Sequence, residues 1–420
     1  MKTIFQLGLA CALVVITLSF VFPGLYQIGE WKTLDLRFQI QGKIDTDPRI
    51  IMVDADDTSS DYYGRWPWKR SVHSEMIKKL NESGAKTIIY DVLFADPGDS
   101  VEDNQLVAAT KQAGNIVLPF AINLDDKSNN IVNEQSSSLK LYGIDNTFLY
   151  SNNYRTLKDT ILPIKPLIKV SGGLGHIAAN RDQDGIIRRV PLLVKNHESL
   201  LPSLAFKGLL NYLNIPNSKV DITDSSIILK DVSLPGGREF DTIKIPIDSY
   251  GQMVINYAGQ WEETFKHASF ASVLSEKSRD INHKREDLTE KIVLVSNVIS
   301  GHDIKSTPLE KDYPGAGIHA NIINTILTRN FLRETKPLFN YSLIFLLCIA
   351  TASLIEGRRY YIQTVKVIIF LITFIISSYY LFTSGIVVKV FMPILSIFLT
   401  LLVALVYKSS LEKDLSDNFQ

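Results

Sequence analysis

Oxygen-bearing side chains stand at the ends of three short apolar runs. Asp54 and Asp56 close the first run, Asp91 closes the second, and Ser296 with Asn297 closes the third. Carboxylates grouped with an amide and a hydroxyl suit a hard cation such as Mg²⁺ or Ca²⁺, and they suit a polar small molecule equally well. Asp at a strand end also commonly caps the element that follows it. The residue types therefore predict either a ligand site or a series of local caps.

Two further residues lie in the loop after the third run. If this late run forms a strand beside the first, Asp303 and Thr307 converge with the strand-end residues, because ligands bind outside the carboxyl ends of the strands in open α/β sheets. A divalent cation is the one cofactor that we associate with these groups. No nucleophile elbow or phosphate loop is present, so we expect no catalytic residue and no enzymatic activity. The predicted ligand-binding residues are Asp54, Asp56, Asp91, Asn297, Asp303 and Thr307.

The densest aromatic segment provides a second candidate surface. Trp66 and Trp68 flank a Pro just before a predicted helix, and Arg70 follows them. Two Trp side chains beside an Arg are typical of a recognition surface. The same rings can instead fix the start of the helix against the sheet. Both interpretations stay open at this stage.

Histidine and cysteine indicate no metal centre. The seven His residues include no pair with metal-binding helical spacing, and we interpret His302 and His319 as structural. The two Cys residues, Cys11 and Cys348, both fall in long apolar segments, so the polar part of the chain has no thiol for a disulfide or a zinc site. The metal content of the protein stays unassigned.

The spacing of apolar residues predicts the elements that position these groups. Residues 50–53 and 86–92 read as buried strands, and residues 69–82 have helical spacing between them. Strand, helix, strand of this kind is typical of a right-handed parallel crossover unit. We therefore predict an α/β domain with a mixed, partly parallel sheet. Further strands are predicted at 115–119, 186–194, 220–229, 243–247, 251–258 and 291–295, and helices at 101–112, 201–213 and 316–328.

Four apolar segments are long enough to cross a bilayer, which takes roughly 20 residues. They cover residues 4–22, 338–355, 365–382 and 386–407, so one precedes the predicted α/β domain and three follow it. The first segment has no small-residue cleavage site after it, and we interpret it as an uncleaved signal anchor. The predicted parts are an anchor at 1–23, an extracytoplasmic sensory domain at 24–336, three membrane helices at 337–407 and a short cytoplasmic tail at 408–420.

The positions of Lys and Arg predict the orientation of these segments. Basic residues close to a membrane segment tend to stay cytoplasmic. With four crossings, the basic groups near the segments fall on one face, so both termini are expected in the cytoplasm and the large domain outside. The net charge is zero, which gives no case for nucleic acid. The basic residues used here are Lys2, Arg358, Arg359, Lys366, Lys408 and Lys413.

The order of several motifs resembles a known sensory family. The sequence is similar to the CHASE family, type two, an extracellular sensory domain of bacterial membrane receptors that is followed by three membrane helices. The resemblance covers nearly the whole chain. The residues that carry it are Asp35-Leu36-Arg37, Val53–Asp56, Gly64–Arg70, Asp91–Phe94, Asp182–Arg189, Asn256–Gly259, Lys291–Val295, Asp303, Thr307-Pro308 and Pro314–Asn321.

The resemblance implies a sensor in the bacterial inner membrane that passes a signal through its helices. Family members usually continue into a histidine kinase or a nucleotide cyclase, whereas this chain stops at Gln420, so we expect a separate protein partner in the membrane or cytoplasm. A homo-oligomer is also expected, and Gly8 with Ala12 forms one small-residue pair that suits helix association. Two alternatives stay open: a docking subunit of a larger cell-envelope complex, and an ectoenzyme that uses the carboxylates with a divalent ion.

Overall fold

The computed structural model describes residues 2–125, 139–145, 153–196, 199–233, 239–275, 287–299, 303–356 and 359–417. The chain forms two compact units. One unit combines Met1–Gln41 with Leu332–Gln420, and it is called the membrane unit below. The other unit is Gly42–Phe331, and it is called the head. Residues 24–41 and 332–336 were predicted to lie in the sensory domain, whereas in the structure they belong to the membrane unit.

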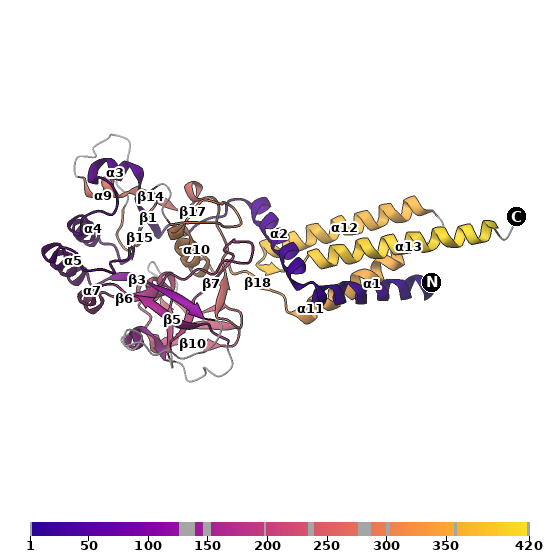
Figure 1. The fold of residues 1–420 in the computed structure, drawn as a ribbon, viewed down its shortest axis with the longest axis horizontal. Coiled ribbons are helices and arrows are strands. Elements are labelled where there is room, and N and C mark those ends of the chain that lie inside the picture. The colour runs from indigo at the N-terminus through magenta and orange to yellow at the C-terminus, as the bar shows by residue number, and fades with distance from the viewer. Residues whose placement is uncertain are drawn as a thin grey trace. The chain divides into compact units, whose positions relative to one another are not determined.

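A large mixed sheet organises the head (Figure 1). Within the described residues, ten strands form this sheet in the order β14-β1-β15-β2-β3-β5-β8-β9-β4, and β6 also pairs with β3. The strands from β14 to β3, together with β6, are parallel. The parallel strands are β14 (Lys266–Ser269), β1 (Ile50–Ala55), β15 (Ile292–Asn297), β2 (Thr87–Asp91), β3 (Ile116–Asp125) and β6 (Gly173–His176).

The remaining strands of the sheet continue it in mixed directions. β5 pairs antiparallel with β3, and β9 pairs antiparallel with both β8 and β4. The predicted α/β class with a mixed, partly parallel sheet is therefore confirmed. These strands are β5 (Thr156–Ile161), β8 (Leu193–Asn196), β9 (Ser199–Pro202) and β4 (Ile144–Asp145).

One feature of the strand order differs from a simple crossover unit. β15 lies between β1 and β2, although it comes from a much later part of the chain. All three strands are buried along nearly their whole length. Continuous runs of apolar, mostly β-branched residues are what a parallel sheet covered on both faces requires.

Helices near the start of the head cover one face of the parallel strands. Met76, Ile77 and Leu80 of α4 join Val53 of β1 and Val293 of β15 in one apolar core. The side chain of Asp99 caps α5 by accepting hydrogen bonds from two backbone N–H groups of its first turn. The helices of this region are α3 (Asp57–Tyr63), α4 (Arg70–Glu82), α5 (Ser100–Ala113), α7 (Lys165–Val170) and α9 (Phe270–Leu274).

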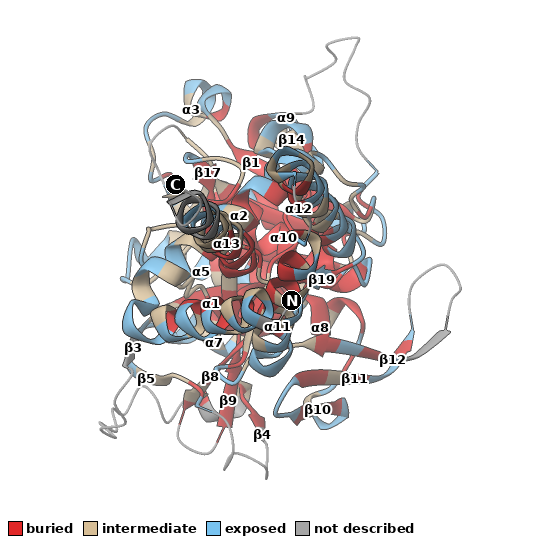
Figure 2. Cartoon of the chain, turned by 90° about the vertical axis from the view of Figure 1, so that its right-hand side faces the viewer, coloured by how far each residue is buried: buried red, intermediate tan, exposed pale blue. Residues whose placement is uncertain are grey.

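Two helices cover the opposite face. α8 (Leu204–Tyr212) packs on β2 and β3, and α10 (Gly315–Leu327) packs on β15 and on α8. Two glycines permit this close approach, because a Cβ at Gly208 would lie 2.2 Å from Ile89, and a Cβ at Gly175 would lie 2.4 Å from the backbone of Leu204. Figure 2 shows α10 as a largely buried helix. Glycine at these two positions thus allows close packing of α8 on the sheet.

Smaller sheets complete the head, and they refine two sequence predictions. The predicted strand 220–229 is a hairpin of two strands, and the predicted strand 251–258 is regular only over three residues. Bounds are β7 (Arg189–Pro191), β10 (Val220–Thr223), β11 (Ser226–Ser233), β12 (Glu239–Pro246), β13 (Gln252–Val254), β16 (Ile304–Lys305) and β17 (Tyr313–Pro314), with 3-10 turns η1 (Leu139–Tyr142), η2 (Asn217–Lys219) and η3 (Trp261–Glu263).

The membrane unit contains the long apolar helices. Among the described residues, four helices are apolar and long enough to cross a membrane: Thr3–Val21, Pro337–Leu354, Tyr360–Thr383 and Phe391–Ser410. Their exposed apolar surface, seen along α12 in Figure 2, is what lipid would cover. These spans lie in α1 (Lys2–Val21), α11 (Pro337–Leu354), α12 (Tyr360–Thr383) and α13 (Phe391–Asp417).

Two further features of the membrane unit were not expected from sequence. α2 (Pro23–Gln41) directly follows the first apolar helix, and β18 (Arg333–Glu334) pairs in parallel with β19 (Ile386–Val387). Ile386, predicted to begin the last span, is therefore in a strand. The small residue Gly8 faces Cys348 and Ala352 of α11 in the same chain, at 3.1 Å from its Cβ position. This small-residue contact thus serves packing within one chain.

Candidate functional site

A row of polar side chains crosses the carboxyl ends of three adjacent strands. In the register of the sheet, Asp54 of β1 pairs with Ser296 of β15, and Ser296 pairs with Asp91 of β2. Laterally paired residues of a sheet point to the same face. Val53 and Val295, their neighbours in sequence, point to the face that α4 covers, so the row points to the face that α10 covers. The predicted convergence of the late strand with the first is therefore observed.

The Asp54 carboxylate is held by a histidine on the neighbouring strand. Its Oδ2 lies 2.6 Å from Nδ1 of His267, and Nε2 of that ring contacts the carbonyl oxygen of Thr264 at 2.9 Å. Burial lowers the pKa of His267, but the hydrogen bond and the charge of Asp54 outweigh it, so the pKa lies above its ordinary value. The other oxygen, Oδ1, is buried and has no hydrogen-bond partner among the described residues. Asp54 thus retains one acceptor that faces no donor.

Asp91 lies at the other end of the row, beside helix α10. Its Oδ2 is 3.7 Å from Nε2 of His319, and burial raises the pKa of the Asp91 carboxyl. Nδ1 of His319 is buried without a hydrogen-bond partner in the described part of the chain, and so is Oγ of Ser296. Asp54 is 6% exposed and Ser296 is 2% exposed, so the row is nearly closed to solvent. Several polar atoms of one small region are therefore unsatisfied, whereas such atoms are normally paired.

Asp303 stands at the start of α10, next to this row. Its carboxylate forms an ion pair with Lys305 at 2.5 Å, and its carbonyl oxygen accepts a hydrogen bond from the N–H of Gly315 at 2.9 Å. A Cβ at Gly315 would lie 1.9 Å from Oδ2 of Asp303. Glycine at this position therefore allows the carboxylate to approach the first turn of the helix. Both Asp303 and Lys305 act electrostatically on Asp91.

The other predicted ligand-binding residues have local structural partners. Asp56 caps α3, since its Oδ1 accepts hydrogen bonds from the N–H of Ser59 at 2.8 Å and from Oγ of Ser269 at 3.0 Å. Asn297 accepts a hydrogen bond from the N–H of Ile299 at 3.1 Å and so closes a turn. The hydroxyl of Thr307 forms two hydrogen bonds with the backbone of Glu310. The structure therefore brings Asp54, Asp91 and Asp303 together around α10, and it places Asp56, Asn297 and Thr307 in caps and turns.

The aromatic segment lies on the opposite face of the sheet. Trp68 is buried, and its Nε1 donates a hydrogen bond to the carbonyl oxygen of Gly64 at 2.8 Å. Trp66 packs edge-on against Trp68 at 5.1 Å and against His73 at 5.5 Å. Arg70 forms an ion pair with Asp103 and lies over the ring of Phe94. These contacts fix the start of α4 to the core, as in the second of the two interpretations, in which the rings hold the helix start against the sheet.

The residue types at the site indicate whether it could hold a divalent cation. Among the described residues, no group of three or more His, Cys, Asp or Glu residues could hold a metal ion. His302 lies outside the described residues. The unsatisfied atoms of the row are a carboxylate oxygen, a hydroxyl oxygen and an imidazole nitrogen on three different elements. This donor set suits a small polar group better than a divalent cation, which needs several oxygen ligands.

Helix α10 also ties together distant segments of the head. Oδ1 of Asn324 accepts a hydrogen bond from the N–H of Asp47 at 2.8 Å, and Oδ1 of Asn321 accepts one from the N–H of Ala258 at 2.8 Å. Nδ2 of Asn256 donates to the carbonyl oxygen of Asn330 at 3.0 Å. The backbone of the segment before β1 and the backbone after α10 are therefore held by the same network of buried amides.

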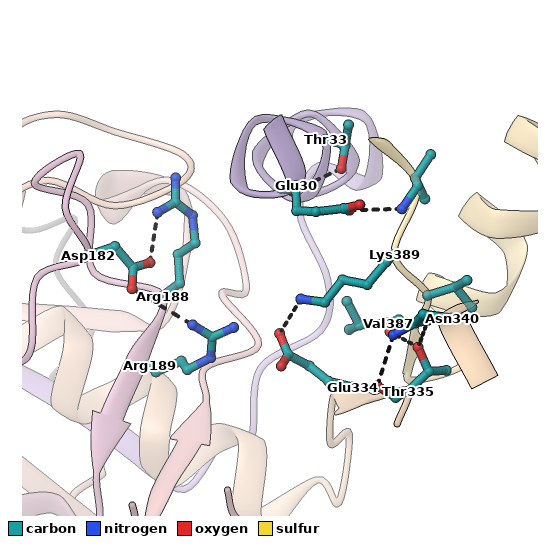
Figure 3. A network of polar contacts seen from close by, with 12 residues as sticks. Glu30, Thr33, Asp182, Arg188, Arg189, Glu334, Thr335, Asn340, Val387 and Lys389 are labelled. Carbon is teal, nitrogen blue, oxygen red and sulfur yellow. Dashed lines mark hydrogen bonds and ion pairs between the residues drawn. The ribbon is translucent and has the colours of Figure 1, made fainter. Parts of the chain in front are cut away.

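A second polar network lies in the membrane unit (Figure 3). The carboxylate of Glu30 on α2 accepts hydrogen bonds from the N–H groups of Val390, Phe391 and Met392, at 2.8, 3.0 and 3.3 Å. These N–H groups open α13, so Glu30 acts as its N-terminal cap from another helix. Arg37 of α2 donates to the carbonyl oxygen of Val388 at 3.1 Å.

The chain segment that enters the last three helices joins the same network. The N–H of Arg333 donates to the carbonyl oxygen of Gly385 at 2.8 Å, and Glu334 forms an ion pair with Lys389 at 3.5 Å. Figure 3 shows Lys389 and Glu334 pointing toward each other. The membrane unit has two chain segments that continue into the head, one with Glu30 and one with Glu334. Each of these residues contacts the start of α13.

Comparison with known families decides the assignment of the chain. The model of the CHASE2 domain matches residues 10–355, which is more than half of the chain. The chain belongs to the CHASE2 family. CHASE2 is a sensory domain family of membrane receptors, so the predicted resemblance is confirmed, and membership supports a sensory role. Comparisons with curated proteins and with solved structures found no match.

The CHASE2 match includes all of the head, and one of its charged motifs is an internal scaffold. Arg188 is fully buried and bonds Asp182 at 2.8 Å and Asp184 at 2.8 Å, and Arg189 also faces Asp182 (Figure 3). A buried arginine between two carboxylates fixes the turn at Gly185. This motif of the CHASE2 domain therefore holds the fold.

Several residues of the candidate site were not predicted from the sequence of this CHASE2 protein. His267 lies on β14, a short strand of mixed polarity without an apolar signal. His319 was interpreted as structural because the seven His residues include no pair with metal-binding helical spacing. Ser296 was recognised at a strand end, but its position between Asp54 and Asp91 depends on the strand order. The alternation of side chains along β15 was the one available signal, since it places Ser296 and Asn297 on opposite faces.

Proposed function

We propose that this protein is a membrane-bound sensor that binds a polar ligand at the row formed by Asp54, Ser296 and Asp91, with His319 above it. The site has unsatisfied buried polar atoms, and a ligand that pairs with them would be held firmly. The single observation that carries the proposal is the connectivity of β1 and α10, which form the two sides of the site. β1 is the first strand of the head after α2, and α10 is its last helix before β18 and α11.

This connectivity supplies a route for the signal. A ligand that contacts both the strand row and His319 favours one position of α10 on the sheet. Because Asn324 of α10 also holds the backbone of Asp47, both chain connections to the membrane unit respond to that position. In the membrane unit, Glu30 and Glu334 then pass the change to the start of α13. The ligand must bind the two states with different affinity for this to occur.

Crosslinking within the membrane unit tests the signalling step. Cys11 of α1 contacts Thr400 of α13, so Thr400→Cys in a Cys348→Ala background places two thiols together. We expect Asp91→Asn to change the oxidation rate of this pair at least about twofold in native membranes, since it removes one charge from the site. Asp221→Asn, at an exposed ion pair with Lys230, serves as the matched control. An oxidation rate that is the same in both variants and in the parent protein would count against signalling.

We further propose that the head is extracytoplasmic and that both termini are cytoplasmic, in the bacterial inner membrane. Cysteine labelling in sealed cells tests this orientation. A membrane-impermeant maleimide should label Ser272→Cys, which is exposed in the head, and should leave Ser410→Cys unlabelled until the cells are lysed. Labelling of Ser410→Cys alone in intact cells would reverse the proposed topology.

The signal is proposed to reach a separate protein in the membrane or cytoplasm, and the sensor is proposed to act as a homo-oligomer without enzymatic activity of its own. Affinity purification from native membranes, followed by native mass measurement, tests both points. A partner whose recovery changes in Asp91→Asn supports sensing. A stoichiometric partner whose recovery is the same in every site variant would favour the docking-subunit alternative.

A further inference from the structure

The unsatisfied atoms of the row share one chemical property. Oδ1 of Asp54 can only accept a hydrogen bond, and Oγ of Ser296 can accept one. His319 presents Nε2 to the carboxylate of Asp91 at 3.7 Å, and with the ring proton on Nε2 its Nδ1 can also accept a hydrogen bond. The site thus offers three acceptors that have no donor among the described residues.

The three carboxylates around the row differ in how closely a positively charged group lies to each. The carboxylate of Asp54 has the imidazole of His267 at 2.6 Å, and that of Asp303 has the ammonium of Lys305 at 2.5 Å. Asp91 has the imidazole of His319 at 3.7 Å, while Lys305 acts on it from its ion pair with Asp303, and burial raises the pKa of Asp91. Among the described residues, no Lys or Arg pairs directly with Asp91, so a positively charged ligand would stabilise its ionised form.

The spacing of the strands limits the size of the charged group. Adjacent strands lie about 4.8 Å apart, so Ser296 stands one strand spacing from Asp54 and one from Asp91. A small group placed over the Ser296 hydroxyl is within reach of both carboxylates. An ammonium group has three N–H donors, which matches one hydroxyl and two carboxylates. A divalent metal does not fit, because no group of metal ligands is present among the described residues.

We propose that the row Asp54–Ser296–Asp91 binds the primary ammonium group of an organic amine. This inference rests on the proposed sensory function and names the chemical class of the ligand. The ammonium donates to Oδ1 of Asp54, to Oγ of Ser296 and to the carboxylate of Asp91, while His319 accepts from a neighbouring donor of the same ligand. The rest of the ligand lies between the strand ends and the first turns of α10.

Thermal unfolding of the full-length protein in detergent tests the proposal. Methylammonium and 1,4-diaminobutane are titrated as chlorides, and tetramethylammonium chloride at equal ionic strength provides a cation without N–H donors. We expect a saturable rise of the midpoint temperature with the two primary amines and none with tetramethylammonium. Asp91→Asn should weaken the apparent affinity at least about tenfold, because a charge-assisted hydrogen bond is lost. Asp221→Asn should leave it unchanged.

Ser296→Ala guards against a variant that fails to fold, since it deletes only one hydroxyl. It should keep the midpoint temperature of the unliganded protein and lower the affinity for methylammonium at least about threefold. A flat response to both amines overturns the ammonium assignment, and so does an equal response to tetramethylammonium. If acetate or ethylene glycol instead stabilises the protein in an Asp91-dependent way, the ligand class is wrong and the sensory site stands. If in addition Asp91→Asn leaves the Cys11 crosslinking rate unchanged, the proposed function fails as well.

Discussion

Glu30 and Val390 are 360 residues apart in the chain, and the Glu30 carboxylate accepts the Val390 N–H at 2.8 Å. A helix that emerges directly after the first span thereby caps the helix that forms the last one. The four N–H groups at the start of a helix have no partner within it, and a buried helix start needs an external acceptor. Glu30 provides this acceptor in the membrane unit.

Replacing Glu30 should separate the two helices. Glu30→Ala leaves three N–H groups of α13 without an acceptor, and we expect a loss of about 1–3 kcal/mol in the free energy of unfolding. Thermal unfolding of the full-length protein in detergent measures it. Glu30→Gln should lose less, because the amide oxygen still accepts. Glu356→Gln, an exposed carboxylate of the same unit, is the control, and an equal loss there would contradict the capping role.

Neutralising Asp91 should stabilise the unliganded head at neutral pH. Burial raises the pKa of this carboxyl above its ordinary value of 3.8, so its contribution to stability is fully present below pH 3.8 and is lost as the pH rises through the folded pKa. Asp91→Asn removes this loss, and we expect a gain on the order of 1 kcal/mol at pH 7. Denaturant unfolding at several pH values checks it. If Asp91→Asn is less stable than the wild type at pH 7, the Asp91 carboxylate already has a stabilising charge partner in the unliganded head.

The ion pair between His267 and Asp54 also predicts a loss of stability as the pH rises, but here the cause is the loss of the proton on His267. The pKa of His267 is raised above 6.5 by Asp54, so the stabilisation from the pair is fully present below pH 6.5 and disappears as the pH rises through the folded pKa. His267→Gln should flatten the stability profile in this range and cost about 1–3 kcal/mol at pH 6. Lys266→Gln, the neighbouring exposed residue on β14, should keep the slope. An unchanged slope in His267→Gln would assign the titration to another group.

Asn324 should control the stability of the segment that enters the head. Asn324→Ala leaves the buried N–H of Asp47 without an acceptor, which costs about 1–3 kcal/mol locally. Hydrogen exchange read by mass spectrometry should show faster exchange for residues 43–49. Thr328→Ala, at the exposed residue that follows α10, removes a hydroxyl that bonds the Asn324 carbonyl but keeps the Asn324 side chain, so it should leave this exchange rate as it is. Equal rates in both variants would remove Asn324 from the coupling network.

Gly315→Ala should disturb the site without changing its charge. The added Cβ would meet Oδ2 of Asp303 at 1.9 Å, so the carboxylate must move away from the first turn of α10. We expect a loss of about 1–2 kcal/mol in stability. Unfolding of Gly24→Ala, where the added Cβ meets nothing within 4 Å, provides the comparison. A Gly315→Ala variant as stable as Gly24→Ala would mean that the Asp303 side chain relocates freely.

The sequence was sufficient for those elements that carry their own signal. β1, β2 and β15 are short apolar runs, α4 and α10 have helical spacing, and the four apolar helices follow from length alone. The carboxylates at the strand ends could also be predicted, because they directly follow these apolar runs. Which of them face one another depends on strand order, and nothing local in residues 291–295 indicates that this strand lies between β1 and β2.

Other parts of the site carry no periodic signal. β14 is only four residues long and mostly polar, so His267 could not be placed beside Asp54. Asp56 and Asp54 are alike in sequence, yet Asp56 lies past the end of β1 and caps α3, because a helix start needs an acceptor there. The Glu30 contact with α13 joins two ends of the chain, and a single sequence contains no trace of such a pairing.

The central place of β15 has a consequence for the synthesis of the protein. β15 begins at residue 292, which is 201 residues after β2 ends at residue 91, so β1 and β2 are synthesised long before the strand that separates them. Until it arrives, the inner edges of both strands expose backbone groups and apolar side chains that invite wrong pairing. We therefore expect a fragment that ends before residue 292 to expose the inner edges of β1 and β2 and to aggregate more readily than the full-length chain.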